Sequence, residues 1–131
     1  MKIIIVDPQA DAIAAQLRQM DNDITIEGVY TDGNHGVEAI CALLPDVAIV
    51  NIDIANVSQL AVLRQHDQPE TEFVLLSDWA TFAYEAFRFG AVDFLLKPFE
   101  FGELKKSFVR VAKKVRDKLL IKEVLQRLHQ E

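Results

Sequence analysis

The chain contains very little cysteine: Cys41 is the only one among 131 residues. A single cysteine excludes an internal disulfide and a cysteine-based zinc site. The residues around it at positions 39, 40, 43 and 44 are apolar, which favours a small buried side chain over a reactive thiol. Histidines are also few, because only His35, His66 and His129 occur, and they lack the spacing of metal ligands. We expect all three to be ordinary surface residues.

Long hydrophobic runs are absent as well. No stretch approaches the ~18 apolar residues of a membrane span. The apolar run at the N-terminus meets an acid at Asp7, which is too early for a secretory signal. These two absences favour a cytoplasmic protein that does not enter a membrane.

Hydrophobic residues nevertheless make up 50% of the chain, enough for one domain with a sizeable core. Charge is distributed unevenly: residues 1–99 carry 5 Lys/Arg and 15 Asp/Glu, whereas residues 100–131 carry 9 and 5. A basic segment can contact nucleic acid or an acidic partner, but long exposed helices are commonly basic for solubility. We favour the solvated face and expect no direct binding of nucleic acid.

Five short apolar runs alternate with amphipathic patterns along the chain. The predicted strands are 2–6, 24–31, 47–50, 73–76 and 92–96. The predicted helices are 10–20, 36–44, 57–65 and 81–89, the last of them ending at Gly90. The glycine-rich run 32–36 lacks a phosphate-binding pattern and is interpreted as a turn into the second helix. Near-continuous apolar strands separated by amphipathic helices indicate an α/β protein with a doubly wound, five-stranded parallel sheet.

The C-terminal stretch predicts one long helix. From Phe101 to about residue 129 apolar residues recur at three- and four-residue steps, which gives a helix of about 28 residues, ~42 Å long. Only its first half is needed to cover the sheet. We therefore divide the chain into a domain of residues 1–115 and an extension of residues 116–131.

The extension carries apolar side chains that the domain has no means to cover. They are Leu119, Leu120, Ile121, Val124, Leu125 and Leu128. We predict that they pair with the same helix of a second copy, parallel or antiparallel. Their phase shifts near residues 118–121, so a regular coiled coil is not expected. The alternative is that the extension leads to an output domain.

Polar residues follow the predicted strands at their carboxyl ends. They are Asp7 and Pro8 after the first strand, Asn51 and Asp53 after the third, Ser77 and Asp78 after the fourth, and Lys97 after the fifth. In a doubly wound sheet, ligands bind beyond these ends, where the strand order reverses. We therefore expect these residues to converge on one crevice.

Three segments resemble the receiver domain of bacterial response regulators, the CheY-like family. They are Ile3-Ile4-Ile5-Val6-Asp7, the run from Pro45 to Asp53, and the run Tyr84-Glu85-Ala86-Phe87-Arg88-Phe89-Gly90-Ala91-Val92-Asp93-Phe94-Leu95-Leu96-Lys97-Pro98-Phe99. The resemblance covers roughly residues 2–112 and implies a flavodoxin-like sheet with strand order 2-1-3-4-5. The last run is similar to that of regulators with LytTR-type or AraC-type DNA-binding domains.

Carried over position by position, the resemblance implies a site that is only half present. Ser77 matches the hydroxyl that contacts the phosphoryl group, Lys97 the lysine that pairs with it, and Phe94 the switch aromatic. Asp7 matches the first of two adjacent acids. Pro8 stands where the second acid, a magnesium ligand, is expected, and Asn51 replaces the phosphoacceptor aspartate. We therefore expect magnesium binding to be weak or absent and no other cofactor.

Two further side chains are candidates at this crevice. Asp53, which the family places in the loop beyond the strand tip, is an alternative phosphoacceptor; otherwise it is a solvated loop acid or a partner of Lys97. Trp79 either borders the crevice, as a cap or partner contact, or packs against its own helix.

Two functions compete on these grounds. The first is a non-enzymatic signalling module, an atypical receiver that works without aspartyl phosphate and forms a homodimer through its last helix. The second is a working two-component receiver, phosphorylated from a histidine kinase and forming the N-terminal part of a DNA-binding regulator. An unrelated enzyme on the same fold is disfavoured, because no nucleophile stands beside a positioned base.

Overall fold

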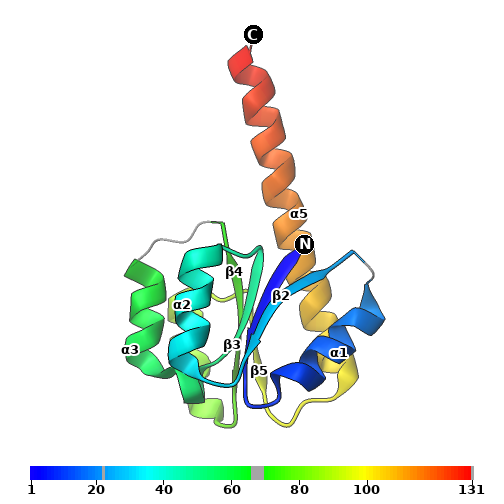
Figure 1. Cartoon of the computed structure of the whole chain (residues 1–131). Helices are drawn as coiled ribbons and strands as arrows, with labels where there is room; N and C mark the ends of the chain where they lie inside the picture. The colour runs from blue at the N-terminus through cyan, green and yellow to red at the C-terminus, as the bar shows by residue number, and fades with distance from the viewer. Residues whose placement is uncertain (22, 66–69, 131) are drawn as a thin grey trace.

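The computed structural model describes residues 1–21, 23–65 and 70–130. Its centre is a parallel sheet in the order β2-β1-β3-β4-β5 (Figure 1), as the sequence predicts. The strands are β1 (Lys2–Val6), β2 (Thr25–Tyr30), β3 (Val47–Asn51), β4 (Glu72–Ser77) and β5 (Asp93–Leu96). The central strand β3 is buried along its whole length, which explains its uninterrupted apolar sequence.

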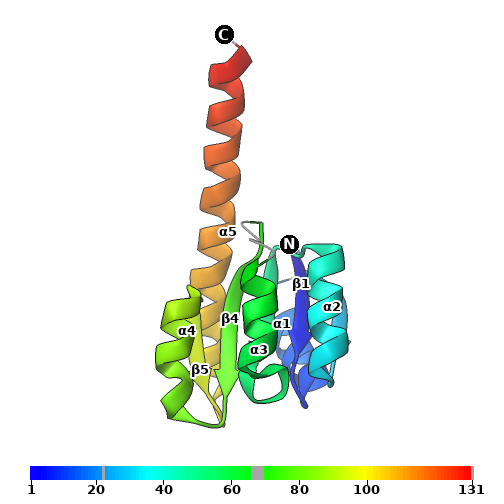
Figure 2. The same cartoon turned by 90° about the vertical axis from the view of Figure 1, so that its left-hand side faces the viewer.

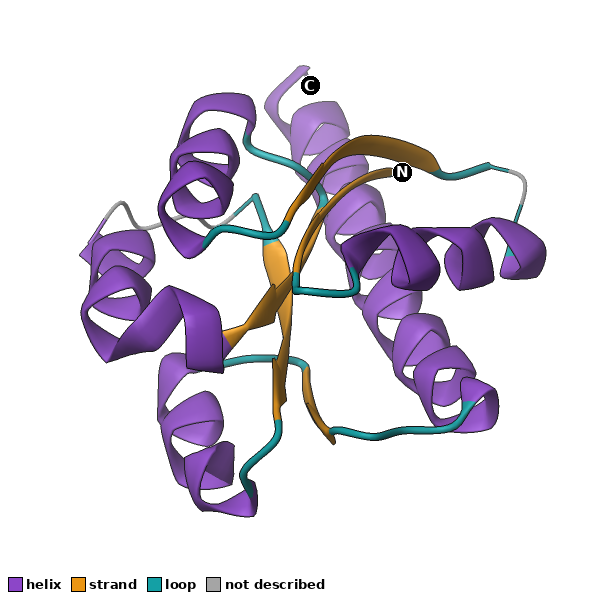
Figure 3. Cartoon of the chain, turned by 60° about the horizontal axis from the view of Figure 1, so that its bottom comes forward, coloured by secondary structure: helices purple, strands orange, loops and turns teal. Residues whose placement is uncertain are grey.

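Helices cover both faces of the sheet. They are α1 (Ala10–Met20), α2 (Gly33–Leu43), α3 (Ile52–Gln65), the short 3₁₀ helix η1 (Ala80–Phe82), α4 (Ala83–Phe89) and α5 (Phe101–Gln130). Alternate side chains of β1 point to opposite faces: Ile3 and Ile5 pack with α1 and α5, whereas Ile4 and Val6 pack with α2, α3 and α4. Figure 3 shows the sheet between these two layers of helices.

Three predicted helices differ from the structure at their starts. Helix α2 begins at Gly33 rather than at residue 36, because Asp32 caps it by accepting from the Asn34 N–H at 3.1 Å. Helix α3 begins at Ile52 but is interrupted at Asn56, whose φ of 53° and ψ of 171° are non-helical, so the predicted helix 57–65 is its second part and the first turn was missed. The last predicted helix divides into η1 and α4, and it ends at Gly90 as predicted, with a left-handed φ of 90°.

The predictions for the scattered single residues hold in part. Cys41 is half-buried rather than buried, and its partial desolvation raises the pKa of the thiol. His35 and His129 are exposed, as expected, whereas His66 lies outside the described residues. Within the described part of the chain, no helix combines the length and apolar character needed to cross a membrane.

Helix α5 has two halves with different surroundings. Its buried apolar side chains end at Val115, which is 5% exposed, whereas Phe101 and Val109 on the outer side are exposed. Beyond that residue the helix leaves the domain and passes the amino ends of the strands, where it projects alone (Figures 1 and 2). Two ion pairs tie its base to the start of β4: Lys118 to Glu72 at 2.9 Å and Lys122 to Glu70 at 2.5 Å.

The extension exposes the apolar side chains that the sequence singled out, and we call them the apolar stripe. Each is between 50% and 62% exposed. The members of the stripe are Leu119, Leu120, Ile121, Val124, Leu125 and Leu128.

Candidate functional site at the carboxyl edge of the sheet

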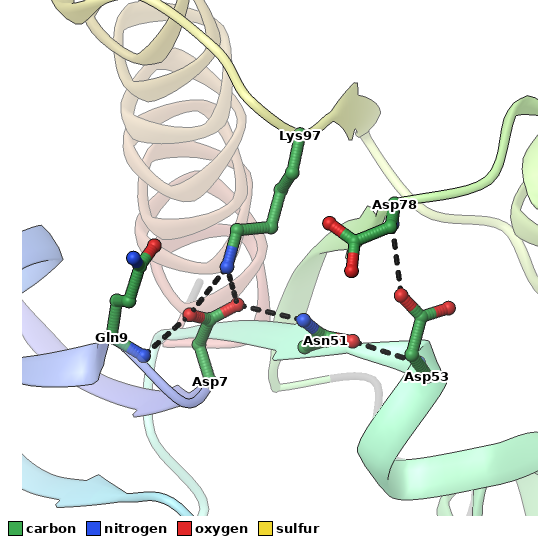
Figure 4. Close-up of polar contacts among 6 residues, drawn as sticks. All are labelled: Asp7, Gln9, Asn51, Asp53, Asp78 and Lys97. Carbon is green, nitrogen blue, oxygen red and sulfur yellow. Dashed lines mark hydrogen bonds and ion pairs between the residues drawn. The ribbon is translucent and has the colours of Figure 1, made fainter.

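The predicted polar residues do converge at the carboxyl ends of the strands (Figure 4). Asp7 directly follows β1, Asn51 ends β3, Ser77 ends β4, and Lys97 directly follows β5. Sheet-like backbone hydrogen bonds continue one residue beyond β1 and β5. The Asp7 N–H donates to Tyr30 O at 2.9 Å, and the Lys97 N–H donates to Ser77 O at 2.7 Å. Residues distant in sequence are thereby held beside each other.

Asp7 is the centre of the site. Its side chain is fully buried, and each of its two carboxylate oxygens accepts two hydrogen bonds. Oδ1 accepts from the Gln9 N–H at 2.8 Å and from Lys97 Nζ at 2.9 Å. Oδ2 accepts from Asn51 Nδ2 at 2.9 Å and from Lys97 Nζ at 3.0 Å. This set of donors offsets the cost of burying the charge.

Lys97 therefore pairs with Asp7, and the predicted alternative of a Lys97–Asp53 pair is wrong. The lysine side chain is only 12% exposed, and its ammonium spans both oxygens of the acid. A compact, desolvated pair of this kind attracts more strongly than a surface pair, because solvent screens it less.

Asn51 suits its position because it has both a donor and an acceptor. The side chain is 2% exposed. Its amide nitrogen donates to Asp7, while Oδ1 accepts from the Asp53 N–H at 2.8 Å. A carboxylate at residue 51 would face Asp7 with a second negative oxygen instead of a donor. The amide thus completes the network around the buried acid.

Asp53 does not lie in a loop, as was expected, but in the first turn of α3. Its Oδ1 accepts from the Ser77 hydroxyl at 2.7 Å, and its Oδ2 accepts from the Asp78 N–H at 2.8 Å. The Ser77 hydroxyl oxygen in turn accepts from the Trp79 N–H at 2.9 Å. The interpretation of Asp53 as a solvated loop acid is also wrong, because both of its oxygens bind the turn after β4.

The remaining candidates lie around this network. Pro8 is exposed and lines a shallow cavity of about 440 Å³ together with Gln9, Asp78 and Lys97. Phe94 is half-buried and packs against the core beneath α2, α3 and α4. Trp79 is 63% exposed and borders a second cavity of about 260 Å³ beside Asp53. Phe82 of η1 lines the same cavity, so the predicted roles of Trp79, beside the crevice or against its own helix, stay predictions.

Sequence reasoning missed two contributors, Gln9 and the backbone of Asp78. Both act through a main-chain N–H that donates to a carboxylate. The side chain gives no signal for such a role. The only indication available was their position, one or two residues beyond a strand end, where free N–H groups are common.

The family resemblance implies a magnesium ion at this site. Three acids lie at this edge (Figure 4): Asp7 and Asp53, whose four carboxylate oxygens all accept from N–H or O–H groups, and the exposed Asp78. Among the described residues no group of three or more His, Cys, Asp or Glu is arranged to hold a metal ion. The donors do not fit a hard cation that requires several anionic oxygens.

Comparison with known proteins identifies the family. The model of the response regulator receiver domain matches residues 3–109, and the chain belongs to this family. The transcriptional regulatory protein BtsR of Escherichia coli (strain K12) is 30% identical over 114 residues, which cover 85% of this chain and 48% of that protein. The chain thus spans about half the length of BtsR.

Solved structures agree with the fold. The response regulatory domain of mrkE from Klebsiella pneumoniae superposes with a TM-score of 0.76 at 22% identity, covering 89% of this chain and 99% of that one. NtrX from Brucella abortus superposes with a TM-score of 0.79 at 23% identity. That match covers 99% of this chain and 30% of NtrX, so it includes the long last helix.

Proposed function

We propose that this protein is an atypical receiver that transmits signals without aspartyl phosphate and without catalysis of its own, and that it pairs with a second copy through the apolar stripe. The observation that carries the first part is the closed network of Asp7, Lys97 and Asn51. In it a buried carboxylate has its charge balanced and its four hydrogen bonds made by the chain itself.

The side chain at residue 51 supports this proposal. Phosphoryl transfer to a receiver needs a nucleophilic carboxylate oxygen, and an uncharged amide does not supply one. Asn51 moreover uses its oxygen to accept from the Asp53 N–H. Asp53, the other carboxylate in reach, has both oxygens bound to the turn after β4.

The same contacts support weak or absent magnesium binding. A divalent cation at Asp7 must displace the Lys97 ammonium and the Asn51 amide, and it gains no carboxylate from Pro8. Phosphoryl transfer relies on the cation to neutralise charge on the transferring oxygens. Weak metal binding and the missing nucleophile therefore act in the same direction.

Incubation with acetyl phosphate and magnesium, followed by intact mass measurement, tests the proposal. We expect the mass to stay unchanged in the parent chain. A matched control is the double variant Asn51→Asp with Pro8→Asp, which regains the acidic residues and shows whether the reagent is active. A phosphoryl adduct on the parent that disappears in Asp53→Ala contradicts the proposal and identifies a working phosphoacceptor.

The apolar stripe supports pairing of two copies. Its six side chains lie within ten residues of one helix and are all at least half exposed. A second copy of the same stripe has the same length and apolar character, so the two are self-complementary. Covering these side chains stabilises the dimer by about 25 cal/mol for each Å² of apolar surface removed from water.

Sedimentation of the 131-residue chain against a chain ending at Val115 tests this pairing. Val115 is the last buried residue of α5, so the shortened chain keeps the whole core. We expect the full chain to sediment as a dimer and the shortened chain as a monomer. Equal monomeric masses contradict the pairing.

A second candidate is the receiver part of a larger transcription regulator, controlled by a histidine kinase. Two observations favour it: the similarity to BtsR, a transcriptional regulatory protein of about twice this length, and the helix that projects away from the domain (Figure 2). Under this candidate a LytTR-type or AraC-type output domain follows the extension. Immunoblotting of the natural protein from cells tests it, because a mass well above that of this chain is expected.

A further inference from the structure

The turn after β4 is held by a carboxylate from another part of the chain. The Ser77 hydroxyl and the Asp78 N–H both donate to Asp53, at 2.7 and 2.8 Å. The two bonds end on different oxygens, so the carboxylate bridges two donors from adjacent residues. Figure 4 shows Asp53 reaching towards Asp78 from the start of α3.

Burial makes this bridge important for Ser77. Ser77 is 0% exposed, so in the intact structure its hydroxyl depends on Asp53 as its acceptor, and a buried hydroxyl without a partner is costly. The Ser77 oxygen also accepts from the Trp79 N–H. A chain of hydrogen bonds therefore runs from the Asp53 carboxylate through Ser77 to the backbone of Trp79.

Asp53 is itself fixed in place. Its N–H donates to Asn51 Oδ1 at 2.8 Å, which ties the start of α3 to the tip of β3. An aspartate at residue 51 offers the same acceptor, but it brings the negative charge of that oxygen beside Asp7. The amide at residue 51 thus positions Asp53 without adding charge to the site.

We propose that Asp53 is a positioning residue whose carboxylate serves as a permanent internal ligand of the turn formed by residues 77–79. The turn is held by an anion that belongs to the chain and needs none from solution. This deepens the proposed function and rests on it in one respect, namely that no phosphoryl group competes for the two donors. The exposed Trp79 at the end of this chain of bonds is then presented in one fixed conformation.

Amide hydrogen exchange in buffer without magnesium, phosphate or phosphodonor tests this inference. In Asp53→Ala we expect exchange at Asp78 and Trp79 to become roughly ten-fold faster or more, because a charge-assisted hydrogen bond is lost. In Ser77→Ala we expect a different pattern, with faster exchange at Trp79 while the Asp78 amide stays protected by Asp53. A purely structural defect does not produce these two patterns.

A matched control exists at the opposite edge of the sheet. Asp46 Oδ2 accepts from the Lys2 N–H at 2.7 Å, so Asp46→Ala removes the same kind of bond far from the turn. It is expected to leave exchange at Asp78 and Trp79 unchanged. Should Asp53→Ala fail to fold, Asp53→Asn keeps the shape but leaves one of the two donors without an acceptor, and faster exchange at residues 77–79 is again expected.

Formate provides a direct readout of ligand replacement. It is the fragment that Asp53→Ala removes, and the cavity of about 260 Å³ beside Asp53 and Trp79 opens the position to solution. We expect added sodium formate, but not sodium chloride of equal ionic strength, to restore protection at Asp78. Unchanged exchange at Asp78 in Asp53→Ala, or equal effects of the two salts, overturns the inference. Neither result depends on whether the chain accepts phosphate or forms a dimer, so the two proposals fail separately.

Discussion

The two ends of this molecule differ in how far their side chains have partners within the chain. At the carboxyl edge of the sheet, buried polar groups satisfy one another: the four oxygens of Asp7 and Asp53 all accept hydrogen bonds from the same chain. Beyond the amino edge, the apolar stripe of α5 is at least half exposed along its length. We call the first the closed end, because its polar groups have partners within the chain, and the second the open end, because its apolar side chains are exposed to solvent.

This difference indicates where the molecule can interact. A buried network of polar groups resists change, because breaking any member leaves a charge or donor without a partner. An exposed apolar stripe gains free energy from the surface that a partner buries, and no internal hydrogen bond has to be broken. The network at the carboxyl edge is thus costly to rearrange, whereas the extension has apolar surface that a partner can cover.

The largest expected effect comes from breaking the closed end. Lys97→Ala leaves the fully buried Asp7 without its counter-charge, and removing one partner of a buried pair costs about 3–5 kcal/mol. Urea unfolding measures this as a lower free energy of unfolding. The double variant Asp7→Asn with Lys97→Ala is the control and is expected to recover part of the loss, because the unpaired charge is gone. A loss below about 1 kcal/mol in Lys97→Ala is the size of a surface pair and contradicts this role.

The next largest effect is expected from a substitution in the apolar stripe. Leu125→Asp places a charge within the apolar stripe and is expected to raise the dissociation constant of the dimer by about ten-fold or more. Analytical ultracentrifugation over a concentration series measures it. Gln126→Asp is the matched control, because it adds the same charge at the next exposed position, on the side of the helix opposite Val124 and Leu128. Equal effects of the two substitutions argue against the stripe as the interface.

A third change replaces the hydrogen-bonded network at the carboxyl edge by a site with additional acids. Asn51→Asp with Pro8→Asp removes the donor to Asp7 and adds two carboxylates, so without metal the free energy of unfolding is expected to fall by about 1–3 kcal/mol. Magnesium is expected to restore it and to change the fluorescence of Trp79, the only tryptophan. The parent is expected to show neither response. Failure of the variant to bind magnesium weakens the interpretation of this edge as an altered metal site.

The smallest effect concerns the base of the extension. A hydrogen bond from Lys122 holds the pKa of the Glu70 carboxyl below its ordinary value of 4.5. A lowered pKa in the folded state means that the pair stabilises the fold above the ordinary glutamate pKa. This contribution is lost as the pH falls through the lowered one. Lys122→Ala is therefore expected to reduce stability slightly at neutral pH and not at all in strong acid, as thermal unfolding at both pH values can show. Both side chains are about half exposed, so salt weakens the effect.

Much of the fold and part of the site could be predicted from the sequence. The five strands were placed to within one or two residues, since their apolar runs are short and clearly bounded. The residues at the strand ends could be named because parallel strands bring their carboxyl ends to one edge. The start of α2 was missed because the Asp32 cap lies inside a glycine-rich run that resembles a turn.

The partners within the site could not be predicted. Lys97 had three oxygen-bearing side chains within plausible reach, and its choice of Asp7 joins residues 90 positions apart. Asp53 was assigned to a loop, yet it turns towards Ser77 because α3 begins directly after β3. Such choices depend on differences of a few ångströms between loops, which no local pattern encodes.

By itself the sequence determined where strands and helices form, which residue ends each strand, and that α5 continues as one apolar-striped helix. These follow from periodicity and side-chain chemistry, which are local properties. Only the tertiary structure decided which carboxylate receives which donor and at which residue α5 leaves the core. Both depend on the order of the strands and on the distance between segments far apart in sequence, because a hydrogen bond or a packed side chain needs its partner within a few ångströms.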